Sequence, residues 1–321
     1  MDVKVGTFNL NNLFSRFNFA GEIEALNEGD TEVSVSYTFN DPGTYRIRTF
    51  QGKLVKEKPA EERSLIASRI LAMDVDVLAV QEVEDINILR SFARDSLASQ
   101  YPYQVLIEGN DPRLIDIGIL SKLPVGAITS WRYAVHPENI SDQVFSRDLL
   151  EVEILNPTRS KRLFTVYNNH LKSQYVPFNE DPVLGAERAN RRRLQQAEIV
   201  ARIIAARMRP NSSYIVLGDM NDSVESEFLE PMINSPDLGL VNGLTQPRET
   251  RPPKPDDPPP GTTAWTHRFK PAGLPARYEL FDQIWLSPAL AVKQTDAVID
   301  RRMKHSGDGS DHDPAWIHIS L

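Results

Sequence analysis

Residues 74–84 read DVDVLAVQEVE, and this stretch indicates the fold class. From Asp76 to Gln81 an apolar run is bounded by charged and polar residues, which is typical of a strand buried on both faces. The preceding segment, Pro59 to Met73, begins with proline and two glutamates and continues with apolar residues at helical spacing. A helix that packs against a buried strand predicts an α/β fold.

Short apolar runs alternate with helix-period segments along the rest of the chain, and no fixed repeat is visible. A second helix is expected from about Ala186 to Met208, where the apolar stripe continues until Pro210. Further strands are expected at Val3–Phe8, Asp116–Ser121, Leu149–Leu155, Leu163–Asn168, Tyr214–Leu217, Phe281–Leu286 and Ala315–Ile319. This number of strands suits two stacked sheets in one domain over residues 1–321.

Two stretches interrupt the alternation. Residues 33–39 and 45–55 alternate apolar and polar positions around Asn40–Gly43, which predicts an exposed hairpin insertion at about residues 30–56. Residues 247–260 read PRETRPPKPDDPPP and hold seven of the chain's 23 prolines, so we expect a loop that does not pair within a sheet.

Composition limits the possible functions. With 36 basic and 44 acidic residues the net charge is −8, which does not exclude a nucleic-acid substrate because one basic face can coexist with a negative total. Cysteine is absent, which excludes disulfides, thiolate zinc sites and cysteine nucleophiles. No export signal or membrane-length apolar run is visible. We therefore expect a soluble, by default cytoplasmic, protein without an obligate protein partner.

Polar clusters at the ends of predicted strands carry the chemistry. They are Asn9, Gln81–Glu82, Asn169–His170, Asp219 with Asn221, and Asp311–His312. Polar groups at strand ends converge on one rim of a sheet, where α/β enzymes place their sites. Carboxylate and amide oxygens at such a rim suit Mg²⁺, or Mn²⁺, rather than zinc.

The order N…QE…NxH…GDxN…D…SDH resembles the endonuclease/exonuclease/phosphatase superfamily. That superfamily includes pancreatic-type deoxyribonucleases, apurinic endonucleases, inositol polyphosphate 5-phosphatases and neutral sphingomyelinases. The resemblance runs from Val3 to Ile319, and LAVQEVE, GDMND and SDHDP are its most specific pieces. It implies a four-layer α/β sandwich, two stacked mixed sheets flanked by helices, that hydrolyses phosphate esters with a divalent metal.

The resemblance also implies a metal region. Glu82 is the expected principal Mg²⁺ ligand, with Asn9 nearby and Asp311 completing the region. Asn11 stands where the family often has an aspartate, so one negative charge near the metal is missing. A single tightly bound ion is therefore favoured over two.

The catalytic groups implied by the resemblance surround that metal. Asp219 would orient or deprotonate the attacking water, and Asn221 would donate hydrogen bonds to the phosphate. His312 would contact the phosphoryl oxygens while Asp282 orients its ring. His170 would be a further donor on the phosphate side.

Weaker candidates concern substrate binding. They are Asn11, Arg147, Lys172, Arg188, Arg192 and Arg193, to which Asp116, Lys122, Asp148 and Arg191 add polar groups in neighbouring segments. A plain salt bridge or a solvated basic helix face explains these charges equally well. The remaining histidines, His136, His267, His305 and His318, lack matching context and are expected to be structural or exposed.

The leading function is a Mg²⁺-dependent phosphodiesterase, most similar to bacterial nuclease-type members, that cuts DNA or RNA. The alternative is hydrolysis of inositol phosphate or sphingomyelin-type headgroups with the same centre and different loops. A catalytically silent binding protein of the same fold ranks third, because all of the expected site residues are present.

Overall fold

A computed structural model gives the fold. It describes residues 1–13, 15–17, 45–48, 53–56, 58–111, 113–176, 179–209, 211–255, 257–258, 264–270, 273–303 and 308–321, of which 15–17, 45–48 and 53–56 are described by backbone alone.

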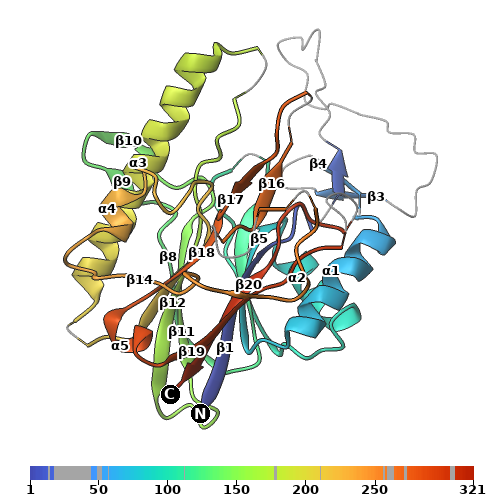
Figure 1. Cartoon of the computed structure of the whole chain (residues 1–321), viewed down its shortest axis with the longest axis vertical. Helices are drawn as coiled ribbons and strands as arrows, with labels where there is room; N and C mark the ends of the chain where they lie inside the picture. The colour runs from blue at the N-terminus through green and yellow to red at the C-terminus, as the bar shows by residue number, and fades with distance from the viewer. Residues whose placement is uncertain are drawn as a thin grey trace, which may run out of the picture.

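Two mixed β-sheets form the centre of the molecule (Figure 1). The first has the strand order β15 (Arg248–Glu249), β19 (Gln294–Ile299), β20 (Ala315–Ser320), β1 (Asp2–Asn9), β5 (Val77–Val83), β7 (Asp116–Ser121), β6 (Tyr103–Leu106). The second has the order β14 (Val241–Asn242), β18 (Asp282–Leu286), β13 (Tyr214–Asp219), β12 (Arg162–His170), β11 (Leu149–Leu155), β8 (Val125–Ser130). Within these sheets β1 and β5 are parallel, as are β12 and β13. The two stacked mixed sheets predicted from the sequence are confirmed.

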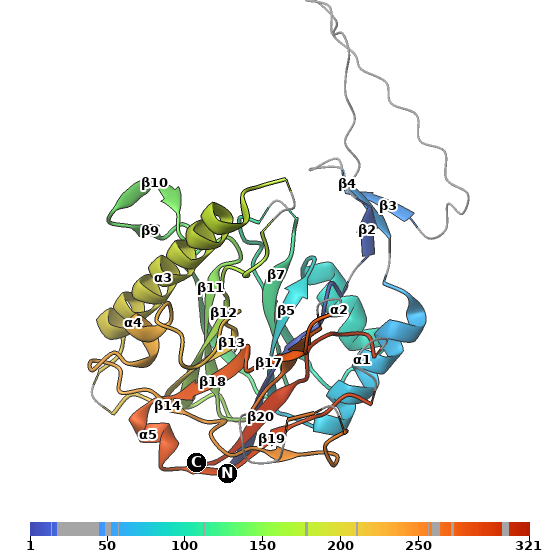
Figure 2. The same cartoon turned by 45° about the horizontal axis from the view of Figure 1, so that its top comes forward.

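Helices cover the outer faces of both sheets (Figure 2). The first sheet packs on α1 (Ala60–Met73) and α2 (Ile86–Asp95), through a cluster that includes Ile66 and Phe92. The second packs on α3 (Pro182–Arg207) and α4 (Glu230–Ile233), and a short helix α5 (Pro288–Ala291) follows β18. The order helix, sheet, sheet, helix gives the expected four-layer α/β sandwich.

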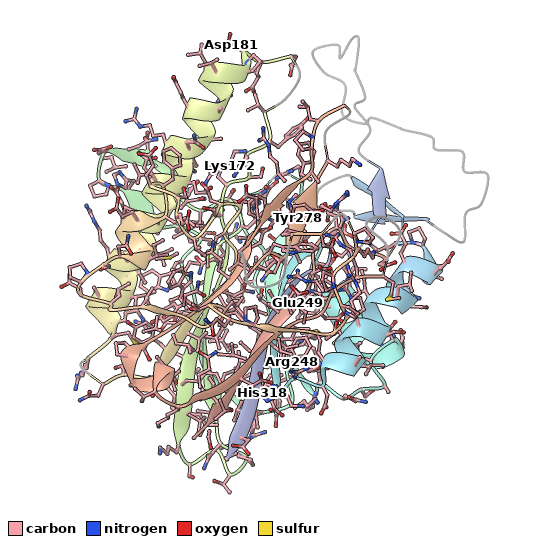
Figure 3. The ribbon with its side chains drawn as sticks, viewed as in Figure 1. Lys172, Asp181, Arg248, Glu249, Tyr278 and His318 are labelled. Atoms are coloured by element: carbon pink, nitrogen blue, oxygen red, sulfur yellow. The ribbon has the colours of Figure 1, made fainter. Side chains whose placement is uncertain are left out.

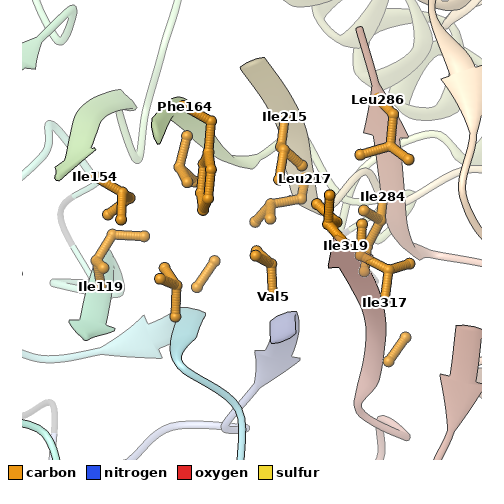
Figure 4. Packing of buried hydrophobic residues seen from close by; sticks show 14 of the residues in the cluster. Val5, Ile119, Ile154, Phe164, Ile215, Leu217, Ile284, Leu286, Ile317 and Ile319 are labelled. Atoms are coloured by element: carbon orange, nitrogen blue, oxygen red, sulfur yellow. The ribbon is translucent and has the colours of Figure 1, made fainter. Parts of the chain in front are cut away.

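The hydrophobic core lies between the two sheets (Figure 4). Val5, Ile119 and Ile317 point from the first sheet toward Phe164 and Ile215 of the second, and all five are fully buried. Burying aliphatic side chains from both sheets removes their apolar surface from water, which fixes the two sheets against each other. The strand ends at the rim of this core are therefore held in place.

Helix α3 begins four residues earlier than the apolar stripe predicted. The carboxylate of Asp181 accepts hydrogen bonds from the backbone N–H groups of Val183 and Leu184 at 2.9 Å, and Pro182 occupies the first turn. Capping and proline at the first position start a helix before its buried stripe begins.

Short strands outside the two main sheets correct the predicted insertion. Residues 45–55 were expected to form one strand, but β3 (Tyr45–Arg48) and β4 (Lys53–Lys56) pair antiparallel, with β2 (Ser15–Phe17) on the other side of β4. Gly52, between the two strands in the sequence, is the turn signal that the prediction overlooked. Residues 33–39 lie outside the described part of the chain.

The proline-rich stretch also differs from expectation at its start. Arg248–Glu249 pair in parallel with β19, although the stretch was expected not to enter a sheet. Both residues precede the consecutive prolines that begin at Pro252, so their N–H groups remain available for pairing. Residues 256, 259 and 260 lie outside the described residues. Two further two-stranded ribbons are β9 (Val135–His136) with β10 (Asn139–Gln143), and β16 (His267–Phe269) with β17 (Arg277–Glu279).

Candidate active site

The polar clusters meet at one edge of the sandwich. Strands β1, β5, β12 and β13 end at this edge, and β7, β11, β18 and β20 begin there, as the pairings Asn9 with Gln81, His170 with Asp219, and Asp219 with Asp282 show. One of the five clusters, Asp311–His312, therefore stands before a strand, β20, whereas the other four stand at strand ends as expected. In Figure 3 Lys172 lies toward this end of the molecule and His318 toward the opposite end.

A hydrogen bond joins the two sheets at this edge. Asn9 Nδ2 donates to Asp219 Oδ2 at 2.9 Å, and the other Asp219 oxygen accepts from the backbone N–H of Asn221 at 2.9 Å. Asp219 is 1% exposed. Burial raises the pKa of Asp219 to about 6, although the neighbouring His312 acts in the opposite direction. A carboxylate with this pKa is suited to accept a proton near neutral pH.

His312 lies between two carboxylates. Its Nδ1 is 2.7 Å from Asp282 Oδ2, and its Nε2 is 3.9 Å from Asp219 Oδ2. Burial opposes a charge on His312, but the carboxylates of Asp282 and Asp219 raise its pKa well above the usual range. The ring is thus a doubly protonated donor held in orientation by Asp282.

His170 is a neutral histidine at the same edge. Its Nε2 lies 3.5 Å from Asp219 Oδ2, and Nδ1 is buried and has no hydrogen-bond partner among the residues that the structure describes. Burial, followed by the charges of Arg147 and His312, lowers the pKa of His170 well below its usual value. Asn221 has a positive φ of 53° and donates through Nδ2 to Leu171 O at 3.1 Å, which ties it to the chain beside His170.

A β-bulge places Glu82. The pairing of β5 with β7 shifts register between Gln81 and Val83, and Glu82 has φ +61°. Its Oε2 accepts a hydrogen bond from the backbone N–H of Asn12 at 3.0 Å, and its own carbonyl accepts from Leu13. A bulge of this kind redirects one side chain out of the strand's alternation.

Glu82, Asn9 and Asp311 supply oxygen atoms that suit a divalent cation. Among the described residues Glu82 has no ion pair with Lys, Arg or His, and a partly buried carboxylate of this kind favours a cation. Ser310 Oγ donates to Asn9 O at 2.7 Å, which fixes the segment that carries Asp311 beside Asn9. The donor chemistry fits a hard ion such as Mg²⁺.

Asn11 has φ +45°, and its N–H donates to Asn9 Oδ1.

A second cluster of titratable side chains shares Asp311. One side-chain nitrogen or oxygen of each of His267, Asp311 and His312 lies within 4.8 Å of the others, although His312, when doubly protonated, has no nitrogen free to bind a metal. His267 was expected to be structural or exposed, but its ring lies 4.9 Å from that of His312 and stacks on Phe281. Burial lowers the pKa of His267 to about 4, so its ring is neutral. His267 has no recognisable motif around it in the sequence. An isolated antiparallel β-bridge between the backbones of His267 and His312 brings the two residues together, and only the tertiary structure shows it.

Three charged residues near the site escaped the sequence analysis. Lys58 is 7% exposed, donates to Asn11 O at 2.6 Å, and its charge interacts with those of Glu82 and Asp311. Asp111 binds the Arg113 guanidinium at 3.0 Å, and the same oxygen lies 3.0 Å from Arg147 Nε. Asp111 and Arg113 belong to the sequence NDPR, which comes shortly before β7 at the site edge. Charged residues directly before a predicted strand are a signal that could have identified them.

Among the α3 arginines predicted to form a substrate face, Arg193 is buried, whereas Arg188 and Arg191 are exposed and Arg192 is partly exposed. Arg193 is 1% exposed; its Nε donates to Asp222 at 2.7 Å and its Nη1 donates to Lys172 O at 2.7 Å. This expectation was wrong for Arg193, because a buried, paired guanidinium cannot reach a substrate. Arg188 pairs with Glu180, Arg191 with Glu138, and Arg192 with Asp142 and the carbonyl of Gln143.

The remaining weaker candidates divide between the two ends of the sheets. Asp116 and Asp148 lie at the site edge, where Asp116 accepts from Gly109 N at 2.8 Å and Asp148 accepts from Trp131 N at 2.7 Å. Lys122 follows β7 at the opposite edge and pairs with Asp74, so its expected place beside the site was wrong.

The other histidines lie apart from these groups. His136 binds Glu198 at 2.6 Å, and His318 accepts a hydrogen bond from the Trp316 indole at 3.2 Å. His305 is outside the described residues.

The fold and the site define an α/β sandwich hydrolase with a carboxylate and histidine centre at its strand ends. Residues 6–312 match the model of the Endonuclease/Exonuclease/phosphatase family, and the chain belongs to that family of metal-dependent phosphoesterases. Comparison with curated protein sequences finds no match.

Solved structures share the fold at low sequence identity. Truncated Caenorhabditis elegans TDP2 is 16% identical, with a TM-score of 0.58 over 100% of this chain and 98% of that one. D. rerio TDP2 in complex with single-strand DNA product is 14% identical, with a TM-score of 0.57 over 100% of this chain and 99% of the other. The Bacteroides thetaiotaomicron mannosyl-6-phosphatase is 13% identical, with a TM-score of 0.56 over 99% of this chain and 100% of the other. At these identities the likeness establishes the fold.

None of the described helices combines the length and the apolar character that a membrane crossing requires.

Proposed function

We propose that this phosphoesterase hydrolyses phosphodiester bonds in nucleic acid with one bound Mg²⁺, for which Mn²⁺ can substitute. The observation that carries the proposal is the buried Asp219 placed within 4 Å of two histidines of opposite protonation state. The cations Arg113, Arg147 and Lys172 beside this centre favour a substrate with several phosphates. The similar fold of the TDP2 structure that holds single-strand DNA product supports the choice.

Asp219 acts as the base in this proposal. Its carboxylate is oriented by Asn9 and by the backbone of Asn221, and it accepts the proton of the attacking water. With its pKa raised to about 6, Asp219 is ionised at neutral pH yet still basic enough to take up that proton.

The histidines stabilise the charge that develops on the phosphate. His312, kept protonated by Asp282, donates from Nε2 to a phosphoryl oxygen, while His170 and Asn221 supply neutral donors. Glu82, Asn9 and Asp311 would hold the divalent cation. When bound, that cation supplies positive charge that polarises the phosphoryl group and stabilises the leaving oxygen.

A substrate and metal panel tests the function. The purified chain is incubated with supercoiled DNA, single-stranded DNA, RNA, inositol phosphates and sphingomyelin, with Mg²⁺, Mn²⁺ or excess chelator. Cleavage of DNA or RNA that requires the metal is expected. Asp219→Asn should lower turnover by on the order of 10²-fold or more, and the exposed Asp95→Asn serves as the matched control. Activity that survives metal stripping contradicts the mechanism.

The second candidate is a phosphatase for phosphorylated headgroups. The fold shared with a mannosyl-6-phosphatase favours it. The same panel separates the two candidates, since hydrolysis of inositol phosphates or sphingomyelin without cleavage of nucleic acid selects this alternative. A folded chain that binds but hydrolyses none of the substrates identifies a silent binding protein.

A further inference from the structure

The loop before β7 is fastened to the segment that carries Arg147. Asn110 N donates to Ser146 O at 2.7 Å, and Asn110 Nδ2 donates to Phe145 O at 2.9 Å. Gly109 lies so close that a Cβ there would stand 2.9 Å from Ser146 O and from the Arg147 carbonyl carbon. These contacts hold Asp111 and Arg113 in a fixed position relative to Arg147.

Asp111 orients two guanidinium groups of different exposure. Arg113 donates to both of its carboxylate oxygens, at 3.1 and 3.0 Å, while Arg147 Nε lies 3.0 Å from one of them. The Arg147 side chain is 2% exposed, whereas that of Arg113 is 50% exposed. Arg113 is therefore pre-oriented by a buried carboxylate and still accessible to a ligand.

Lys172 adds a second accessible cation that has no carboxylate partner among the described residues. Its Nζ donates to Ser173 O at 3.3 Å. The backbone is fixed, since Lys172 N donates to Gln196 Oε1 at 2.8 Å and Lys172 O accepts from Arg193. Burial, together with the charges of Arg147 and Arg113, lowers the pKa of Lys172 to about 8. Cations crowded in this way are relieved by a bound anion.

This cationic cluster adjoins the reacting centre. Arg147 Nη1 donates to Leu171 O at 3.2 Å, and Leu171 lies between His170 and Lys172 in the chain. The charges of Arg113 and Arg147 also act on both His170 and Glu82, and that of Arg147 acts on Asp219. Lys172 follows His170 by two residues. An anion bound by Arg113 and Lys172 would thus lie directly beside the phosphate that faces His170 and His312.

We propose that Arg113 and Lys172 form a second anion subsite, which binds the phosphate next to the scissile one in a nucleic-acid strand. The proposal rests on the proposed nuclease function and deepens it. A built subsite for a neighbouring phosphate makes the chain a diesterase that prefers oligonucleotides over isolated diesters. Arg113 would bind this phosphate through the remaining N–H groups of its guanidinium, which Asp111 orients. Lys172 would bind it as a compact positive charge.

Paired substrates test the subsite. The first is a thymidine dinucleotide with one internal phosphate, the second is the same dinucleotide with an added terminal phosphate, and bis(p-nitrophenyl) phosphate reports the centre alone. The native chain should hydrolyse the phosphorylated dinucleotide with at least tenfold higher kcat/KM. Arg113→Gln and Lys172→Met should each bring the kcat/KM values for the two dinucleotides close to each other, chiefly through KM, and the rate on bis(p-nitrophenyl) phosphate corrects each variant for any change at the centre itself.

Matched controls come from the far end of β12. Arg162→Gln and Lys161→Met each remove one positive charge, as the two test variants do. They lie roughly 25 Å from His170, because β12 has nine residues and a strand rises ~3.3 Å per residue. Both should retain the preference. The charge-preserving Arg113→Lys should keep part of it, which separates lost charge from a disturbed fold.

Binding without turnover gives an independent measurement. Affinity for a fluorescent single-stranded oligothymidine is measured in chelator across a salt series. Each of Arg113→Gln and Lys172→Met should reduce the slope of log affinity against log salt by about 0.7. Unchanged slopes, or equal kcat/KM for the two dinucleotides in the native chain, overturn the subsite.

Failure of the underlying function looks different. If the native chain leaves every nucleic-acid substrate uncleaved while hydrolysing bis(p-nitrophenyl) phosphate, the nuclease proposal fails. If an inositol bisphosphate shows the same dependence on Arg113 and Lys172 while the dinucleotides do not, the assignment of the second phosphate to a nucleic-acid strand is overturned.

Discussion

Gly218 is the position where one methyl group should damage both stability and activity. It has φ +126°, and a Cβ built there would stand 2.0 Å from Asn169 O and 2.9 Å from the Asn169 backbone N and C. Asn169 pairs with Gly218 in the parallel ladder of β12 and β13, one residue before His170 pairs with Asp219. Gly218→Ala therefore pushes apart the two strands that carry the base and its neighbouring histidine.

Two contributions set the expected magnitude. A non-glycine residue at this φ costs about 1–3 kcal/mol in backbone strain. A methyl group forced against backbone atoms adds about 1–3 kcal/mol of overpacking, because a strand cannot rotate away as a side chain can. The free energy of unfolding should fall by about 2–6 kcal/mol. Turnover should fall by on the order of 10²-fold, since a misplacement of about 1 Å at a reacting group has this effect.

Urea unfolding followed by circular dichroism measures the first quantity, and phosphodiester hydrolysis at a temperature where the variant is folded measures the second. Gly273→Ala is the control, because Gly273 has φ +73° and no atom within 4 Å of the added Cβ. It should lose only about 1–2 kcal/mol and keep its turnover. If Gly218→Ala unfolds within 1 kcal/mol of the native chain and hydrolyses at the native rate, the close approach of the two strands is refuted.

Three further changes test individual groups. Asp282→Asn should lower the pKa of His312 and reduce turnover by on the order of 10²-fold or more, which an NMR titration of the ring and steady-state rates check; an unaltered titration would reassign Asp282. Burial raises the pKa of Asp148 from 3.8 to about 7, so the folded state holds a proton that the unfolded chain releases, and stability falls as pH rises through this window. Between pH 5 and pH 8 this fall should be about 3 kcal/mol, and Asp148→Asn should remove it in urea unfolding at these two pH values; equal pH slopes in both proteins would contradict the shift. Glu82→Gln should raise the Mg²⁺ concentration needed for half-maximal activity at least tenfold, and an unchanged metal titration would move the ligand role elsewhere.

Local periodicity predicted many of the elements well. Strands β7 and β11 occupy the predicted residues, and α1 begins one residue after its predicted start. Buried strands and amphipathic helices repeat their apolar residues at periods of about two or 3.6, so a short window reveals them. Strands β6, β8 and β19 lack a comparable isolated apolar run, so the sequence did not predict them. They form because each pairs with a neighbouring strand, β7, β11 and β20 respectively.

The identity of the central site residues could also be read from the sequence. Asn9, Glu82, Asp219 and His312 stand beside predicted strands, and strand ends meet at one rim once the sheets form. The sequence alone could not place His267 beside His312, because the bridge between them joins residues 45 positions apart.

The sequence by itself determined a two-sheet α/β sandwich and a row of oxygen- and nitrogen-bearing side chains at its strand ends. Tertiary structure decided which charges face a substrate. Arg193 belongs to a run of arginines on one helix, yet Asp222, 29 residues away, binds it inside the protein. Arg113 lies in a loop without a recognisable motif, yet Asp111, which also pairs with Arg147, holds it half-exposed beside the reacting centre. The pattern of a segment records its own periodicity, whereas the burial and partner of a charged side chain depend on what the rest of the chain brings against it.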